Sequence, residues 1–225
     1  LGLAQRLAFG RPPRAPRGAI TGAARRRGRG ETREPGPAMN QIRESYHAKV
    51  REDAVALVPA QGGALLDVGG GTGVTAARLK ALDRVERAGV VDLVPSTVRA
   101  PGIDFHVSGD LEDPATLEAV LAAEGPFSTI LCLDVLEHLK DPWVVVARLH
   151  EGLAPGGVIV ASIPNINHWK AVFPLVFRGR WELEDAGIRD RTHLRWFVRK
   201  TAIELMTSSG LVLERVRAEP GGGRK

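Results

Sequence analysis

The chain has 225 residues, of which 44% are hydrophobic and 25% are charged, and its formal net charge is +5 at pH 7. This composition excludes wholesale disorder and collagen-like repeats, and no apolar stretch approaches the roughly 18 residues of a membrane span. The single cysteine, Cys132, excludes an internal disulfide and a multi-cysteine zinc site, and we expect a cytoplasmic location.

The positive charge is confined to the beginning of the chain. Residues 1–38 contain nine arginines against Glu31 and Glu34, a net charge of +7, whereas residues 39–225 carry −2. Glycine, proline and arginine dominate the first segment, so we predict a disordered tail over residues 1–38. Because the first methionine is Met39, we interpret this tail as the result of a start site placed too far upstream, with a transit peptide as the alternative. Nucleic acid is therefore not an expected partner of the folded part.

Strands and helices are predicted to alternate from residue 39 onwards. Apolar residues at spacings of three and four predict an N-terminal helix over residues 40–60. Predicted strands then cover residues 64–68, 85–91, 103–107, 129–133 and 158–163, and predicted helices cover 74–82, 114–123 and 142–153. Such alternation builds parallel βαβ units, so we predict one α/β domain with a doubly wound, mostly parallel sheet and helices on both faces.

A glycine-rich loop follows the first predicted strand of this sheet, at the edge where ligands bind in such folds. The loop belongs to the sequence LLDVGGGTG, and its glycines let the backbone approach a ligand closely. The pattern Gly71-x-Gly73-x-x-Ala76 also satisfies the dinucleotide fingerprint, so an NAD(P)-dependent oxidoreductase is an alternative. Asp67 distinguishes the two, because its carboxylate would repel a pyrophosphate but attract a ligand with ammonium and sulfonium charges.

Further acids end the later predicted strands. Asp92 is placed to accept hydrogen bonds from two ribose hydroxyls. Asp110 can accept the exocyclic amine of adenine while Leu111 packs on the ring, and Asp134 ends the fourth strand. Because the carboxyl ends of parallel strands meet at one edge of a sheet, these acids indicate one site for an adenosine-like ligand with positive charge.

Five segments carry a resemblance to a known family. They are LLDVGGGTG at 65–73, VVDLVP at 90–95, SGDLED at 108–113, ILCLDVLEHL at 130–139 and LAPGGVIVASIPN at 153–165. Over residues 42–217 the chain resembles the class I S-adenosylmethionine-dependent methyltransferases. The resemblance implies a Rossmann-like sheet of about seven strands whose last strand, expected at 212–216, runs antiparallel. It also implies S-adenosylmethionine as the cofactor and S-adenosylhomocysteine as the product.

The resemblance further implies which residues bind the cofactor. The glycine loop would lie along its methionine part, with the later strand ends beside the ribose, the adenine and the methionine end in turn. The expected residues are Asp67, Gly69, Gly70, Gly71 and Gly73 in and before the loop, Asp92 and Leu93 at the ribose, Asp110 and Leu111 at the adenine, and Leu133 and Asp134 at the methionine end. Since the strand-end acids are assigned to the cofactor, we expect no metal site.

The acceptor side is expected beyond the fifth predicted strand. We assign residues 62–163 to cofactor binding, 164–200 to an acceptor-side insertion or lid, and 201–217 to a final helix and strand. The insertion contains Trp169, Trp181 and Trp196, which either line an apolar acceptor pocket or pack a helical hairpin onto the sheet. Its NHW and DRTHLRWF sequences resemble a subgroup of bacterial methyltransferases associated with glycan or cell-surface small molecules.

Three histidines are candidate catalytic residues, because a hydroxyl acceptor needs a general base near neutral pH. They are His193 and His168 in the insertion and His138 after the fourth strand. We expect a small-molecule acceptor that is methylated on oxygen or nitrogen. The alternatives are an RNA or protein acceptor and a non-catalytic module that only binds the cofactor. The sequence determines neither the acceptor molecule nor the oligomeric state.

Overall fold

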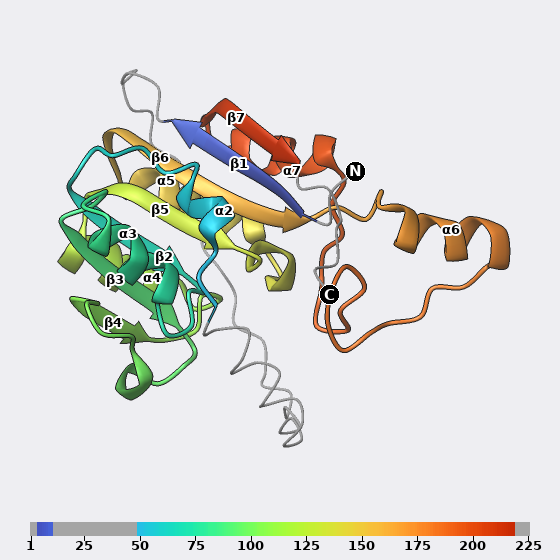
Figure 1. Ribbon diagram of the computed structural model, residues 1–225, viewed down its shortest axis with the longest axis horizontal. Helices are drawn as coiled ribbons and strands as arrows, with labels where there is room; N and C mark the ends of the chain where they lie inside the picture. Colours follow the sequence, from blue (N-terminus) through green and yellow to red (C-terminus); the bar gives the residue numbers. More distant parts are fainter. Residues whose placement is uncertain (1–3, 11–48, 219–225) are drawn as a thin grey trace.

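The computed structural model describes residues 4–10 and 49–218, in which seven strands form one sheet in the order β4-β3-β2-β5-β6-β1-β7 (Figure 1). The strands are β1 (Ala4–Gly10), β2 (Ala64–Val68), β3 (Arg87–Asp92), β4 (Phe105–Ser108), β5 (Phe127–Leu133), β6 (Leu153–Pro164) and β7 (Val212–Ala218). Each neighbouring pair from β4 to β6 is parallel. The predicted doubly wound, mostly parallel α/β sheet is therefore confirmed.

Helices cover both faces of the sheet because successive strand residues point to opposite sides. The helices are α2 (Glu52–Val55), α3 (Val74–Ala81), α4 (Pro114–Glu124), α5 (Pro142–Glu151), α6 (Trp169–Arg178) and α7 (Arg199–Thr207), with 3-10 turns at Ser96–Val98 and Leu136–His138. On β2, Leu65 is buried with residues of α2 and α3, whereas Leu66 is buried with residues of α4, α5 and α7. Among the helices of the described part, none combines the length and apolar character needed to cross a bilayer.

The helices α4 and α5 begin at Asp-Pro pairs. The Asp113 carboxylate accepts a hydrogen bond from the Ala115 amide at 3.0 Å, and the Asp141 carboxylate accepts one from the Val144 amide at 3.3 Å. Each proline occupies the first turn, where the missing N–H is not needed. These local signals explain why both helices lie close to their predicted ranges.

The strand β1 corrects the expectation of a disordered tail. The prediction of disorder over residues 1–38 is wrong for Ala4–Gly10, which pairs with β6 on one side and β7 on the other. These residues precede Pro12, the first proline of the chain, so every amide can donate to a ladder. Pairing on both sides covers the edge that the long β6 would otherwise expose, and Ala8 is buried there. Residues 11–38 lie outside the described residues.

The direction of the last strand also differs from the expectation. β7 pairs antiparallel with β1, and β1 pairs antiparallel with β6. The last strand therefore runs in the same direction as the five parallel strands, and the antiparallel strand of this sheet comes from the N-terminus (Figure 1). The expectation that residues 212–216 run antiparallel to the five parallel strands is wrong. β1, which lies more than 200 residues earlier in the chain, occupies the position beside β6 and is the antiparallel strand instead.

The predicted N-terminal helix over residues 40–60 is largely absent from the part that the structure describes. Residues 40–48 lie outside it, and only Glu52–Val55 is helical. The residue before this short helix, Arg51, has a non-helical backbone, and its amide donates to Thr75 Oγ1 at 3.2 Å. Tertiary contacts at Arg51 therefore override the local periodicity.

Residues 164–200 leave the sheet at the carboxyl end of β6. The helix α6 projects away from the sheet, and a long irregular segment returns from it towards α7 (Figure 1). The return is anchored by a bridge between Asn165 and Phe197 and by two backbone hydrogen bonds, from the amides of Leu194 and Arg195 to the Glu137 carbonyl. The segment is thereby held against the loop that follows β5.

Candidate active site

The glycine loop after β2 requires glycine at three positions. A Cβ atom at Gly69 would lie 2.5 Å from Val135 Cγ2, and one at Gly73 would lie 2.6 Å from Val90 Cγ2. At Gly70 it would lie 2.3 Å from Cγ of Asp67. Gly69 and Gly73 also have φ angles of 67° and 82°, in the left-handed region. The loop is therefore close-packed on its inner side, which leaves its backbone as the surface that can approach a ligand.

Asp67 lies beneath this loop and is 2% exposed. Its Oδ1 atom accepts no hydrogen bond from any residue that the structure describes. Burial, together with the negative charge of Asp92, raises the pKa of Asp67 from 3.8 to about 7, and Arg51 acts in the opposite direction. A buried carboxylate with a free acceptor is stabilised by a positively charged ligand, which is the property that the sequence analysis assigned to it.

The acid at the end of β3 fixes the glycine loop from the other side. The two carboxylate oxygens of Asp92 accept hydrogen bonds from the amides of Gly71, at 2.8 Å, and Val94, at 2.9 Å. His106 of β4, which is only partly buried, contacts the Gly71 carbonyl through Nε2 at 3.0 Å. Each carboxylate oxygen of Asp92 retains a second lone pair for a ribose hydroxyl. Asp92 is thus both a loop anchor and a candidate ligand residue.

The remaining expected cofactor residues lie along the same edge with different exposure. Leu93 is 73% exposed, Leu111 is buried, and Leu133 is half-buried. Asp110 is exposed, and its carboxylate accepts the Glu112 amide at 2.9 Å in a local turn. The exposed leucine and the exposed acid leave apolar and polar groups accessible at the ends of neighbouring strands.

Asp134 follows β5 with a φ angle of 55°, a conformation that non-glycine residues rarely adopt. Its carboxylate accepts a hydrogen bond from Ser162 Oγ at 2.6 Å and forms an ion pair with the Arg51 guanidinium. The same guanidinium donates to Ser162 Oγ at 3.2 Å. The sequence analysis missed Arg51 and Ser162, because the partners are separated by 83 and 111 residues and no local motif connects them.

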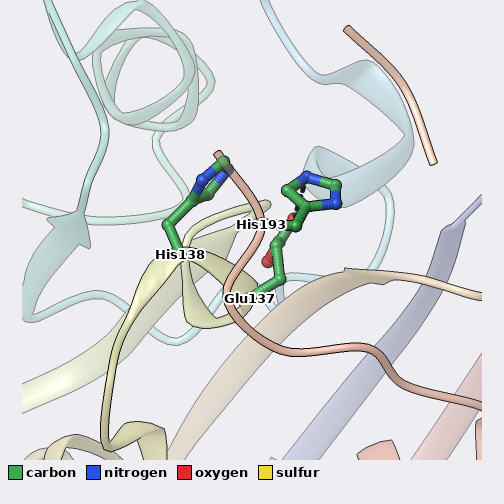
Figure 2. Close-up of side chains that lie close together, drawn as sticks. All are labelled: Glu137, His138 and His193. Carbon is green, nitrogen blue, oxygen red and sulfur yellow. Dashed lines mark ion pairs between the residues drawn. The ribbon is translucent and has the colours of Figure 1, made fainter. Parts of the chain in front are cut away.

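Two of the three candidate histidines lie together, beside a glutamate that the sequence analysis passed over. The rings of His138 and His193 meet edge to face with their centroids 4.8 Å apart, and His193 Nε2 lies 3.9 Å from Glu137 Oε1 (Figure 2). Glu137 is 1% exposed. Burial and the charge of Asp134 raise the pKa of Glu137 well above its usual range. Burial and the neighbouring His138 lower the pKa of His193.

His168 has a different environment. It precedes α6 as the N-cap residue, and its Nδ1 accepts a hydrogen bond from the Lys170 amide at 3.3 Å. Its ring is 1% exposed and packs at 5.9 Å from the ring of Trp169. These contacts give His168 a helix-capping role, and the catalytic role proposed from sequence stays a prediction.

A pocket of about 510 Å³ lies between α6 and residues 184–189. Its walls include Trp169, Phe173, Arg178 and Ile188. The Ile188 carbonyl accepts a hydrogen bond from His193 Nδ1 at 3.2 Å, so one wall of the pocket is bonded to the histidine cluster. The lining combines apolar side chains with both basic residues and the acid Glu184, a mixture that suits a small molecule with an aromatic or aliphatic body and polar groups.

The other two tryptophans of the insertion pack beside the same histidine. The rings of Trp181 and Trp196 are 5.1 Å apart, and the ring of Trp196 is 5.5 Å from that of His193. Trp169 lines a pocket, whereas Trp181 and Trp196 pack against each other and Trp196 also packs against His193. Between β6 and α7 the chain forms the single helix α6, so the alternative of a helical hairpin packed onto the sheet is wrong. An acceptor-binding role for Trp169 stays a prediction.

Comparisons with known proteins identify the family of the chain. The model of a family described as a methyltransferase domain matches residues 39–216. A ubiquinone biosynthesis O-methyltransferase from Xylella fastidiosa (strain 9a5c) is 30% identical over 149 residues, which are 65% of this chain and 56% of that protein. A second such enzyme, from Xanthomonas euvesicatoria pv. vesicatoria, is 28% identical over 187 residues, which are 81% of this chain and 74% of that protein. The chain thus spans just over half the length of the first of these relatives.

Solved structures show the same fold at low sequence identity. A SAM-dependent methyltransferase from Archaeoglobus fulgidus has a TM-score of 0.53 at 15% identity, covering 76% of this chain and 73% of that one. The plantazolicin methyltransferase BamL, in complex with a triazolic desmethylPZN analog and SAH, has a TM-score of 0.54 at 14% identity. The match covers 76% of this chain and 64% of that one.

The fold and the strand-end site define a class I methyltransferase. The chain belongs to the methyltransferase-domain family, and its cofactor is S-adenosylmethionine. The resemblance stated from the five sequence segments is therefore confirmed.

Proposed function

We propose that this protein transfers a methyl group from S-adenosylmethionine to a hydroxyl oxygen of a small molecule in the cytoplasm. The observation that carries the proposal is the pairing of two features at one sheet edge. One is the glycine loop with the buried Asp67 carboxylate beneath it, and the other is the Glu137, His138 and His193 cluster after β5. The names of the curated relatives, which are O-methyltransferases, favour oxygen over nitrogen as the acceptor atom.

The cofactor would lie across the loops that follow β2, β3, β4 and β5. The glycine loop would contact its methionine part, with the Asp67 charge favouring the ammonium group, and Asp92 would receive the ribose hydroxyls. Asp110 and Leu111 would face the adenine. Asp134, held by Arg51 and Ser162, would border the methionine end.

Methyl transfer by such a site is an in-line displacement. The acceptor oxygen attacks the methyl carbon, the carbon–sulfur bond breaks, and the electron pair of that bond returns to the sulfur of S-adenosylhomocysteine. The sulfonium charge already activates the methyl group, so the protein mainly aligns the two reactants and removes the hydroxyl proton. The cluster of Glu137, His138 and His193 after β5 is the group of side chains placed to promote that removal.

Two measurements on the full chain test this proposal. Calorimetric titration should show binding of S-adenosylhomocysteine and none of NAD. Mass spectrometry should then detect a gain of one methyl group on a member of a panel of phenols, sugars and amines, with hydroxyl compounds preferred. Methylation of amines alone would contradict the oxygen preference. Binding of NAD in place of S-adenosylhomocysteine would contradict the cofactor assignment.

A further inference from the structure

The loop after β5 contains a buried acid without a hydrogen-bonding partner. Glu137 lies in the 3-10 turn Leu136–His138 and is 1% exposed. Neither of its carboxylate oxygens accepts a hydrogen bond from any residue in the described ranges. A buried acceptor pair of this kind costs free energy unless something else satisfies it.

The hydrogen bonds of His138 define which of its nitrogens carries the lone pair. Its Nδ1 lies 3.2 Å from the Thr192 carbonyl and 3.1 Å from Thr192 Oγ1. That hydroxyl donates its own proton to Asp190 Oδ1 at 2.7 Å, so towards His138 it can only accept. Nδ1 therefore bears the proton, and Nε2 is the basic nitrogen.

The same reasoning applies to His193. Its Nδ1 lies 3.2 Å from the Ile188 carbonyl, which can only accept, so the proton is again on Nδ1. The basic Nε2 is the atom that lies 3.9 Å from Glu137 Oε1. Imidazoles that bind a metal through one ring nitrogen characteristically donate the N–H of the other nitrogen to a backbone carbonyl, a carboxylate or water.

We propose that Glu137, His138 and His193 form a binding site for a divalent transition-metal ion (Figure 2). One ligand atom from each residue lies within 4.8 Å of the other two. Ligands bound at about 2.0–2.2 Å from a tetrahedral ion are separated by roughly 3.5 Å, so binding requires the side chains to close by about an ångström. Two imidazoles and one carboxylate suit Zn²⁺, Co²⁺, Mn²⁺ or Fe²⁺, and the expectation of no metal site is replaced by this proposal.

Three protein ligands leave at least one coordination position for the substrate. We assign that position to the acceptor hydroxyl, an assignment that rests on the proposed methyl transfer. A bound cation lowers the pKa of a coordinated hydroxyl, so its proton can pass to solvent before the oxygen attacks the methyl carbon. The oxygen–carbon bond then forms as the carbon–sulfur bond breaks, and S-adenosylhomocysteine leaves. No oxidant or reductant is required.

The proposal is tested by metal binding to the full chain, independently of activity. The protein is stripped with a chelator and titrated with CoCl₂, whose visible absorption reports coordination, and ZnCl₂ and MnCl₂ are compared by equilibrium dialysis. We expect one equivalent of Co²⁺ to bind. Glu137→Gln and His193→Ala should each weaken this binding by tenfold or more, since each removes one of three ligands.

Two further variants separate a metal site from a merely structural cluster. Thr192→Val keeps all three ligands but removes the hydroxyl that links Asp190 to His138, and it should weaken Co²⁺ binding by about 10–100-fold. His150→Ala is the matched control. His150 lies in the last turn of α5, where its Nδ1 contacts the Ser209 carbonyl, and it is not part of the cluster. This control should bind Co²⁺ like the wild type.

The outcomes distinguish this inference from the proposed function. Absence of Co²⁺ binding in a protein that binds S-adenosylhomocysteine would overturn the metal site and leave the cofactor assignment intact. Equal Co²⁺ affinity in wild type, Glu137→Gln and His193→Ala would also overturn it. Stoichiometric Co²⁺ binding that is lost in these variants would support the site even if S-adenosylhomocysteine did not bind. In that case the failure would fall on the proposed function.

Discussion

The buried carboxylate of Asp67 predicts that one substitution will move stability and cofactor affinity in opposite directions. The change is Asp67→Asn, which removes the charge and keeps the shape. The pKa of Asp67 is raised from 3.8 to about 7, so in the absence of ligand the folded state disfavours the ionised form. The stability penalty is absent below the unfolded pKa, grows as the pH rises from about 4 to 7, and is constant above that.

The size of the penalty follows from the pKa difference. A shift from 3.8 to about 7 corresponds to an upper bound of about 4 kcal/mol at pH 8. The ligand-free Asp67→Asn protein should therefore unfold at a higher temperature than the wild type at pH 8, and the difference should shrink towards pH 4. Differential scanning calorimetry across this pH range measures it.

The effect on cofactor binding has the opposite sign. Two unit charges about 5 Å apart at an effective dielectric constant of about 20 attract by about 3 kcal/mol, or roughly a hundredfold in affinity. Wild-type affinity for S-adenosylmethionine should also fall about 30-fold between pH 8 and pH 5.5, as Asp67 becomes protonated. The Asp67→Asn variant should show weak binding with a flat pH profile.

The matched control for this experiment is Asp83→Asn. Asp83 is exposed at the end of α3, and its φ of 54° is a conformation that asparagine tolerates well. It should leave both stability and affinity close to those of the wild type. The reasoning would be refuted if Asp67→Asn destabilised the ligand-free protein at pH 8 while binding the cofactor as tightly as the wild type.

Three further predictions concern the fold that supports the site. Gly73→Ala should lower the free energy of unfolding by about 1–3 kcal/mol, because Gly73 has a positive φ and a Cβ there would clash with Val90. It should also weaken S-adenosylhomocysteine binding. An unchanged denaturant midpoint together with an unchanged affinity would contradict this. Asp113→Ala should cost about 1 kcal/mol in urea unfolding through loss of the cap bond to Ala115, with cofactor affinity unchanged. Deletion of residues 1–38 should lower the unfolding temperature, because β6 and β7 lose the strand between them, and an unaltered temperature would show that this pairing adds no stability.

The parts of the site that depend on neighbouring residues could be predicted from the sequence. The glycine loop and the strand-end acids follow apolar runs, and the carboxyl ends of parallel strands necessarily meet at one edge. Asp67 could be assigned a preference for positive charge because burial at a strand end and proximity to the loop are both readable from the sequence around it. The structure adds the free Oδ1 acceptor and the direction of the pKa shift.

The parts that depend on distant pairing could not be predicted. Arg51 reaches Asp134 across 83 residues, and β1 takes its place in the sheet through hydrogen bonds to strands near the other end of the chain. Glu137 looked like an ordinary residue of a short turn, and only the return of residues 190–195 towards it brings His193 within reach. His168, by contrast, sits in a local capping turn that the sequence NHW does not distinguish from a catalytic position.

The central claim is that this sheet edge binds S-adenosylmethionine through the buried acid beneath the glycine loop. The most direct measurement is calorimetric titration of the full chain at pH 8 with S-adenosylmethionine and with NAD, in wild type, Asp67→Asn and Asp83→Asn. We predict binding of S-adenosylmethionine to wild type and Asp83→Asn, strongly weakened binding to Asp67→Asn, and no binding of NAD. Equal affinity of all three proteins for S-adenosylmethionine, or binding of NAD alone, would contradict the account.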